Sequence, residues 1–122
     1  MIKLLVTFLT LMLSNISNAY YPESNTVDWE ILLIVAPEKT MIDGRLVCGD
    51  YPLSLEISRL GSVENTRIDS SVPPRLEKSI KQSAALWKFS PRVVDGVPTS
   101  VSGASVILTI DCNSGEVVVA KN

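Results

Sequence analysis

The most regular pattern along the chain is an alternation of apolar and polar residues that begins at Leu53. Leu53, Leu55 and Ile57 are separated by Ser54 and Glu56, which is the period of two expected for a strand with one buried face. Gly61 can adopt positive φ in a turn, so residues 63–69 can return as the second strand of a hairpin. The returning strand is weakly apolar, and we therefore expect it at the edge of a sheet.

An amphipathic helix is predicted after this hairpin, from Arg75 to about Phe89. Asp69-Ser70-Ser71 offers side-chain oxygens for an N-terminal cap, and Pro73-Pro74 suits the first turn, where a missing N–H costs nothing. Pro91 should end the helix, because proline disfavours helical geometry in the residue before it. The apolar stripe consists of Leu76, Ile80, Ala84 and Trp87.

Further strands are predicted on both sides of this central region. Residues 105–112 alternate again, with Val106, Leu108 and Ile110 on one face. Asn113-Ser114-Gly115 can turn the chain into a short last strand over residues 116–120. Near the other end, residues 31–36 form a β-branched run that predicts a buried strand, with a short partner at residues 45–48 after the Asp43-Gly44 turn.

The first nineteen residues have the pattern of a cleavable secretory signal peptide. Lys3 precedes an apolar run of ten residues, which is too short to cross a bilayer that needs roughly 20. Ser17 and Ala19 supply the small residues that signal peptidase accepts at −3 and −1, so we predict cleavage before Tyr20 and export. A buried first element of a cytosolic protein and an uncleaved anchor are the open alternatives.

Cleavage would leave residues 20–122, enough for one domain and not for two. Loss of Lys3, the one charged residue of the leader, would take the formal charge from −2 to −3. A mildly acidic chain without a basic cluster gives no electrostatic reason to expect nucleic acid or anionic lipid as a partner.

The chain has two cysteines, Cys48 and Cys112, and no histidine. In an oxidising compartment a lone pair favours a disulfide over a metal site, because structural zinc needs four ligands. Such a bond would close a loop of about 65 residues, for which the chain-entropy model allows roughly 4 kcal/mol. Two separate buried thiols are the alternative.

The most distinctive motif lies where the predicted helix ends. It has the pattern W-x-F-x-P, followed by an acidic residue next to a glycine, and then x-P. Two aromatics two positions apart cannot both face inward on an unbroken helix, so the chain must unwind there. With the preceding hairpin and helix, this order of elements resembles the C-terminal domain of the TonB family over residues 50–112. Residues 27–48 and 113–122 have no counterpart in the family pattern, and Cys112 stands where the family tends to have an aromatic. The motif consists of Trp87, Phe89, Pro91, Gly96 and Pro98.

The resemblance implies an α+β fold, in which a small antiparallel sheet packs on one amphipathic helix. The strand order would be residues 63–69, then 53–57, then 105–112, and this arrangement would bring Cys48 towards Cys112. Domains of this family capture an extended peptide of a transporter by adding it to a sheet edge, which needs no catalytic residue and no cofactor. The candidate edge is formed by Ser105, Ile107, Thr109 and Asp111, provided that residues 116–120 leave it uncovered.

We therefore expect a periplasmic protein-binding module that holds an extended peptide or an envelope protein, with a link to TonB-dependent transport implied by the resemblance. The sequence shows neither the anchor nor the proline-rich spacer of a full transducer, so we expect binding without transduction. An accessory subunit of an envelope assembly is the alternative, which an apolar surface left over on residues 31–36 would favour. Trp29 is either a core residue or part of such an interface.

An enzyme is disfavoured, because histidine, the commonest general base near neutral pH, is absent. The carboxylate pairs Asp28 with Glu30 and Asp43 with Asp50 are of a kind that thirteen acids produce by chance.

Overall fold

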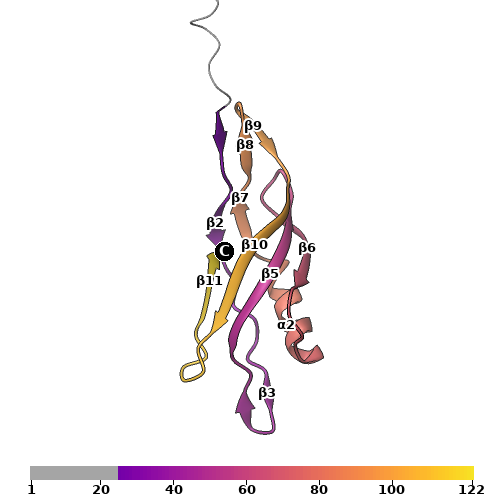
Figure 1. Ribbon diagram of the computed structural model, residues 1–122, viewed down its shortest axis with the longest axis vertical. Helices are drawn as coiled ribbons and strands as arrows, with labels where there is room; N and C mark the ends of the chain where they lie inside the picture. The colour runs from indigo at the N-terminus through magenta and orange to yellow at the C-terminus, as the bar shows by residue number, and fades with distance from the viewer. Residues whose placement is uncertain (1–24) are drawn as a thin grey trace, which may run out of the picture.

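The computed structural model describes residues 25–122; the predicted signal peptide, residues 1–19, lies outside the described residues. Within that part of the chain the fold is mixed α+β, as the resemblance implied, with one helix and several antiparallel sheets (Figure 1). In chain order the elements are β1 (Thr26–Val27), β2 (Glu30–Leu33), β3 (Met41–Ile42), β4 (Arg45–Leu46), β5 (Gly49–Ile57), β6 (Val63–Ile68), α2 (Pro74–Ala84), β7 (Lys88–Ser90), β8 (Arg92–Val94), β9 (Val97–Thr99), β10 (Val101–Ile110) and β11 (Val117–Lys121).

The main sheet has four antiparallel strands in the order β11-β10-β5-β6. Its longest ladder joins β10 to β5, from Ile110 opposite Gly49 to Val101 opposite Ile57, with an irregularity just after Val101. Two predicted hairpins are therefore present: β5 with β6, and β10 with β11.

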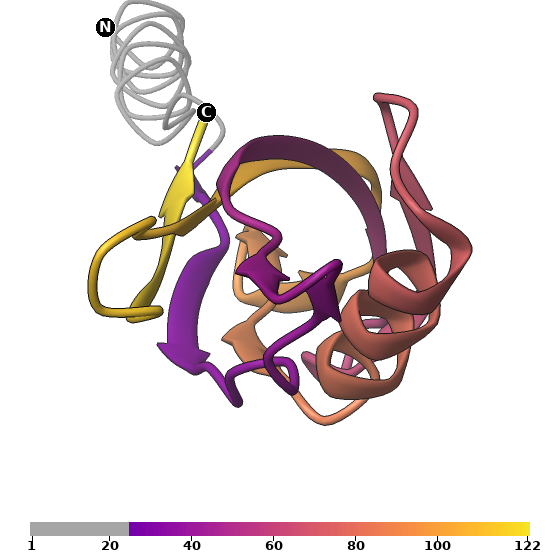
Figure 2. The ribbon, with the colours of Figure 1, turned by 90° about the horizontal axis from the view of Figure 1, so that it is seen from below.

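One face of this sheet and the helix enclose a single core. The alternation in β5 buries Leu53, Leu55 and Ile57, and that in β10 buries the corresponding residues of the neighbouring strand. The helix contributes its apolar stripe to the same cluster, and Figure 2 shows α2 and β11 at opposite sides of the curved sheet. The buried positions of β10 and α2 are Ala104, Val106, Leu108, Ile110, Leu76, Ile80 and Ala84.

The helix is shorter than its sequence pattern predicts, because it ends at Ala84 and not near Phe89. Residues 88–90 leave the helix to form β7, which pairs with β2 through Ile31 opposite Phe89. Trp87 is fully buried although it lies beyond the helix, and its Nε1–H donates to Val35 O at 2.7 Å. Pairing with a strand from the distant N-terminal region thus overrides the local helical period.

The predicted side-chain cap of the helix is also absent. Pro73 occupies the N-cap position and no side chain caps the helix, although Pro74 does begin it as expected. The Asp69 carboxylate is used elsewhere, since it accepts hydrogen bonds from Ser54 Oγ at 2.8 Å and Arg67 Nε at 2.9 Å.

The N-terminal strand is more exposed than its apolar composition predicts. Leu32 and Leu33 in β2 are 66% and 52% exposed, so the expectation of a buried strand over residues 31–36 is wrong. Within residues 25–122, β2 pairs only with the short β7, so it is not embedded in a larger sheet. Trp29, by contrast, is 5% exposed and packs edge-to-face on Phe89, with ring centroids 5.9 Å apart.

The turn between β5 and β6 brings two backbone segments unusually close. Gly61 has φ of +83° and its carbonyl accepts the Phe89 N–H at 2.9 Å. A Cβ atom at this position would collide with the Phe89 carbonyl oxygen. Gly96, in the two-residue turn between β8 and β9, has a similar φ of +81° but no atom within 4 Å of such a Cβ.

These two glycines form a matched pair for measuring the cost of that close approach. We expect Gly96→Ala to lower the free energy of unfolding by about 1–2 kcal/mol, the cost of positive φ for a residue with a Cβ. Gly61→Ala should lose an additional ~1–3 kcal/mol from steric overlap. Urea unfolding of both variants measures the difference, and equal losses would contradict the role given to the Phe89 contact.

Candidate functional site: an open strand edge

The strand expected to be a free edge lies inside the sheet. β10 pairs with β5 on one side and, from Val106 to Ile110, with β11 on the other. The expectation that Ser105, Ile107, Thr109 and Asp111 form the docking edge is therefore wrong, because residues 113–116 reverse the chain and lay β11 over it. Thr109 Oγ1 instead donates to Asp50 Oδ1 at 2.8 Å across β10 and β5.

The open edge of the sheet belongs to β11. Two hydrogen bonds show which alternate residues of β11 bond to β10. Asp111 N–H donates to Glu116 O at 2.9 Å, and Asn122 N–H donates to Ser105 O at 3.0 Å. Even-numbered residues of β11 consequently bond to β10, and odd-numbered residues turn their N–H and C=O groups away from it. No strand among residues 25–122 pairs with these outward groups, which belong to Val117, Val119 and Lys121.

β11 has a protective residue only at its end, where Lys121 stands. Residues 117–120 are Val-Val-Val-Ala, without the proline or inward-pointing charge by which proteins commonly protect an edge. Val118 is 62% exposed on the outer face, while Val117 and Val119 pack half-buried against the core. The opposite edge strand, β6, instead carries the exposed charged residues Glu64 and Arg67.

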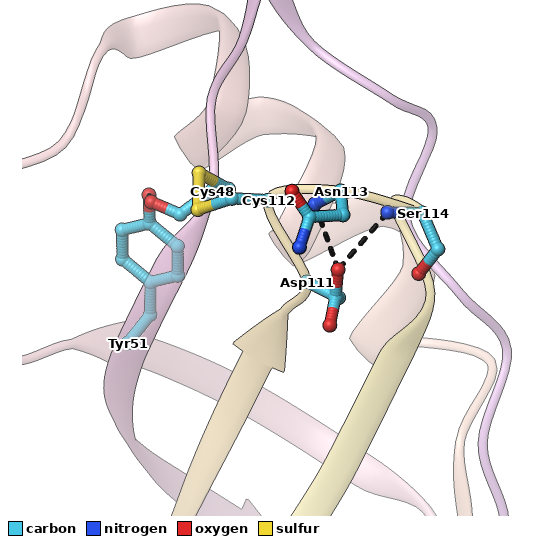
Figure 3. Close-up of a disulfide and its surroundings, with 6 residues drawn as sticks. All are labelled: Cys48, Tyr51, Asp111, Cys112, Asn113 and Ser114. Atoms are coloured by element: carbon cyan, nitrogen blue, oxygen red, sulfur yellow. Dashed lines mark hydrogen bonds between the residues drawn. A yellow bond between two sulfur atoms is a disulfide. The ribbon is translucent and has the colours of Figure 1, made fainter.

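A tight turn fixes the beginning of β11 (Figure 3). The Asp111 carboxylate accepts the N–H groups of Asn113 at 2.7 Å and Ser114 at 2.9 Å, and Gly115 N–H closes the turn onto Asp111 O at 2.8 Å. The hydrogen bonds from Ser114 and then Asn113 hold the pKa of Asp111 below its ordinary value, because they stabilise the ionised form.

The predicted disulfide stands beside this turn. Cys48 and Cys112 are bonded, 64 positions apart in the sequence, so the prediction is confirmed and the alternative of two separate thiols is wrong. Tyr51 Oη donates to Cys48 O at 2.8 Å, which orders the residues that lead into β5 (Figure 3). The bond thus ties the beginning of β5 to the end of β10, next to the point where β11 starts.

Polar contacts hold the other end of β11 against the N-terminal segment. Lys121 Nζ donates to Trp29 O at 2.6 Å, lies 4.2 Å from the Trp29 ring centroid and reaches Asp28 Oδ2 at 3.4 Å. Asp28 also pairs with Arg92, and its pKa is lowered chiefly by the Trp29 N–H and further by Arg92 and Lys121. Sequence reasoning missed this cluster, because its members lie up to 93 positions apart.

The residues of the family motif are not part of the β11 edge. Trp87 and Phe89 are core residues, and Pro91 separates β7 from β8. Gly96 forms the turn after β8, and Pro98 of β9 pairs with Val93 of β8. Within residues 25–122, no cluster of three or more potential metal-ligating side chains occurs. Nor does that part of the chain contain a helix of the length and hydropathy that a membrane span requires.

An unpaired strand edge is a surface to which a strand of a protein partner can be added. The family described as the Gram-negative bacterial TonB protein C-terminal matches residues 47–108, just over half of the chain, and the chain therefore belongs to this family. Its domains are periplasmic interaction modules linked to TonB-type transport, and they are not enzymes. No curated protein and no solved structure shows a significant match to the chain.

The turn before β11 should contribute to stability in a pH-dependent way. Because the pKa of Asp111 is lower in the folded protein than its ordinary value of 3.8, its contribution is present above that value and is lost as the pH falls through the folded pKa. We expect Asp111→Asn to be less stable than the wild type at pH 7, with the difference disappearing in strong acid. Urea unfolding across this pH range tests the prediction, and a difference that grows on acidification would contradict it.

Proposed function

We propose that this protein is a periplasmic binding module that captures an extended segment of an envelope protein by strand addition to β11. The observation that carries the proposal is the row of outward backbone groups on Val117, Val119 and Lys121, which no described strand satisfies. An incoming strand would satisfy them with main-chain hydrogen bonds, and its side chains would supply the specificity.

The surroundings of the edge indicate what kind of segment fits. The exposed side chain of Val118 favours an apolar or β-branched neighbour on the outer face, since cross-strand pairs of such residues stabilise a sheet. A strand reaching the end of β11 would meet Asp28 and Glu30, which lie 3.4 Å and 3.8 Å from Lys121 Nζ. A basic residue at that end of the segment would complement them.

The periplasm is the compartment proposed for this activity. A signal peptide is expected at residues 1–19, and the disulfide between Cys48 and Cys112 suits an oxidising environment. Family membership links the module to TonB-type transport, so a segment of an outer-membrane transporter or of another envelope protein is the proposed partner. In this chain the partner docks beyond β11, one strand further out than β10.

Substitution of proline at Val119 tests this mode of binding. Val119→Pro removes one outward N–H and leaves the β10 ladder intact, because Val119 donates no hydrogen bond to β10. We expect crosslinking in the native envelope to trap a partner on the wild type and to lose most of it with Val119→Pro. Val119→Thr is the matched control, which keeps the N–H and should keep the partner.

The location of the contact gives a second readout of the same experiment. A photoreactive residue at position 118 should capture the partner, and one at position 64 on β6, the opposite edge strand, should not. Unchanged capture by folded Val119→Pro, or capture from β6 alone, would exclude docking at β11.

One observation favours the alternative role as a subunit of an envelope assembly. Leu32 and Leu33, which are consecutive in β2, are both largely exposed, and exposed apolar side chains can mark a protein–protein interface. Size-exclusion chromatography separates the two roles: we expect a monomer for the binding module and an obligate oligomer for the subunit. Leu32→Asp should leave the elution volume of a binding module unchanged, and conversion of an oligomer to a monomer would support the subunit.

A further inference from the structure

A cavity of about 260 Å³ lies between α2 and the segment that leads into β3. Its lining includes three cationic side chains and a single carboxylate, which gives an excess of two positive charges, together with neutral hydroxyl and amide groups. The cations are Lys39, Arg75 and Lys78, and the carboxylate is Glu38. The chain as a whole is acidic, so this concentration of positive charge is local.

The two walls of the cavity are joined by hydrogen bonds. Ser79 Oγ donates to Glu38 O at 3.0 Å, and Arg75 Nη1 donates to Met41 O at 3.4 Å. Thr40, which lies in the lining between these contacts, is 3% exposed. The cavity is therefore part of the folded domain and does not depend on the position of one flexible side chain.

The three cations have no ionic partner within residues 25–122. The ion pairs of this part of the chain involve other cations: Arg67, Lys81, Arg92 and Lys121. Arg75 and Lys78 also stand near the N-terminal end of α2, where the helix dipole disfavours positive charge. A bound anion would offset both effects.

An exposed apolar pair adjoins this basic cavity. Met41 and Ile42 are 47% and 40% exposed on the β3–β4 hairpin, and Arg45 begins the returning strand. Figures 1 and 2 both place this hairpin beside α2 at one end of the molecule. Apolar side chains next to a cluster of lysine and arginine are the pattern of a surface that lies in a membrane interface.

We propose that this end of the domain binds an anionic phospholipid surface, with a headgroup phosphate in the cavity. Arg75 and Lys78 would hold the phosphate, and Met41 and Ile42 would enter the interface beside it. Lys39 also lines the cavity, but its Nζ donates to Ser114 O at 3.4 Å. An acidic protein segment would match the charge of the cavity and leave the neighbouring apolar pair unused. Strand addition does not involve Arg75 or Lys78, so the two proposals can be tested separately.

Flotation with lipid vesicles tests the proposal on the secreted chain. We expect binding to vesicles of phosphatidylcholine with phosphatidylglycerol, and none to phosphatidylcholine alone. Lys78→Gln should weaken binding about fivefold, because a cation near an anionic membrane contributes roughly that factor. Lys78 makes no ion pair within residues 25–122, so the fold should persist, which circular dichroism checks.

Controls distinguish the cavity from a general effect of charge. Lys88→Gln removes the same charge from an exposed position outside the cavity lining and should change binding much less. Met41→Ser with Ile42→Ser should weaken binding to vesicles but not affect backbone amide shifts that inorganic phosphate causes at Lys78 and Ser79.

Several results would overturn the proposal. They are equal loss of binding in the charge control, phosphate shifts without any vesicle binding, and binding to poly-glutamate in place of vesicles. Val119→Pro should bind vesicles normally, so failure of this proposal and failure of strand addition are separable.

Discussion

The pairing of β5 with β10 is the interaction on which the rest of the structure depends. Its register aligns the buried alternation of the two strands, so that Leu53 lies opposite Val106 and Leu55 opposite Ala104. This creates one continuous apolar face for α2 to cover. The same ladder brings Cys48 and Cys112 together at its end, where the disulfide holds the two strands in place.

β11 extends this sheet by attachments that differ along its length. Its beginning is held by the turn at Asp111 and its end by the contacts of Lys121 with Trp29 and Asp28. The apolar residues between them pair with β10 on one side and leave the backbone open on the other. Polar anchors at both ends and an unprotected middle are what a strand needs to stay in position while it offers an edge.

The two proposed surfaces arise from different physics. The β11 edge depends chiefly on backbone geometry, whereas the cavity beside α2 depends on cations that have no ionic partner within residues 25–122. They share no residue. A domain with both could hold a protein segment while it rests on a membrane surface, and each contact can be removed without the other.

The sequence by itself determined the buried faces of the central strands and of the helix, and the places where the central hairpins reverse. Local periodicity predicts the burial of Leu53, Leu55 and Ile57, and the conformational freedom of glycine predicts the turn at Gly61. The disulfide is predicted because the chain has two cysteines, Cys48 and Cys112, and no histidine. Only the tertiary structure decided which neighbour each strand acquires. The helix ends at Ala84 because the residues that follow it form β7 and pair with β2. β10 has no free edge from Val106 to Ile110 because β11 pairs with it there. The cationic side chains of the cavity come from two segments about 40 positions apart, so they do not form a cluster in the linear sequence. Local pattern reports which side of a segment faces the core, whereas edges and charge clusters depend on long-range pairing.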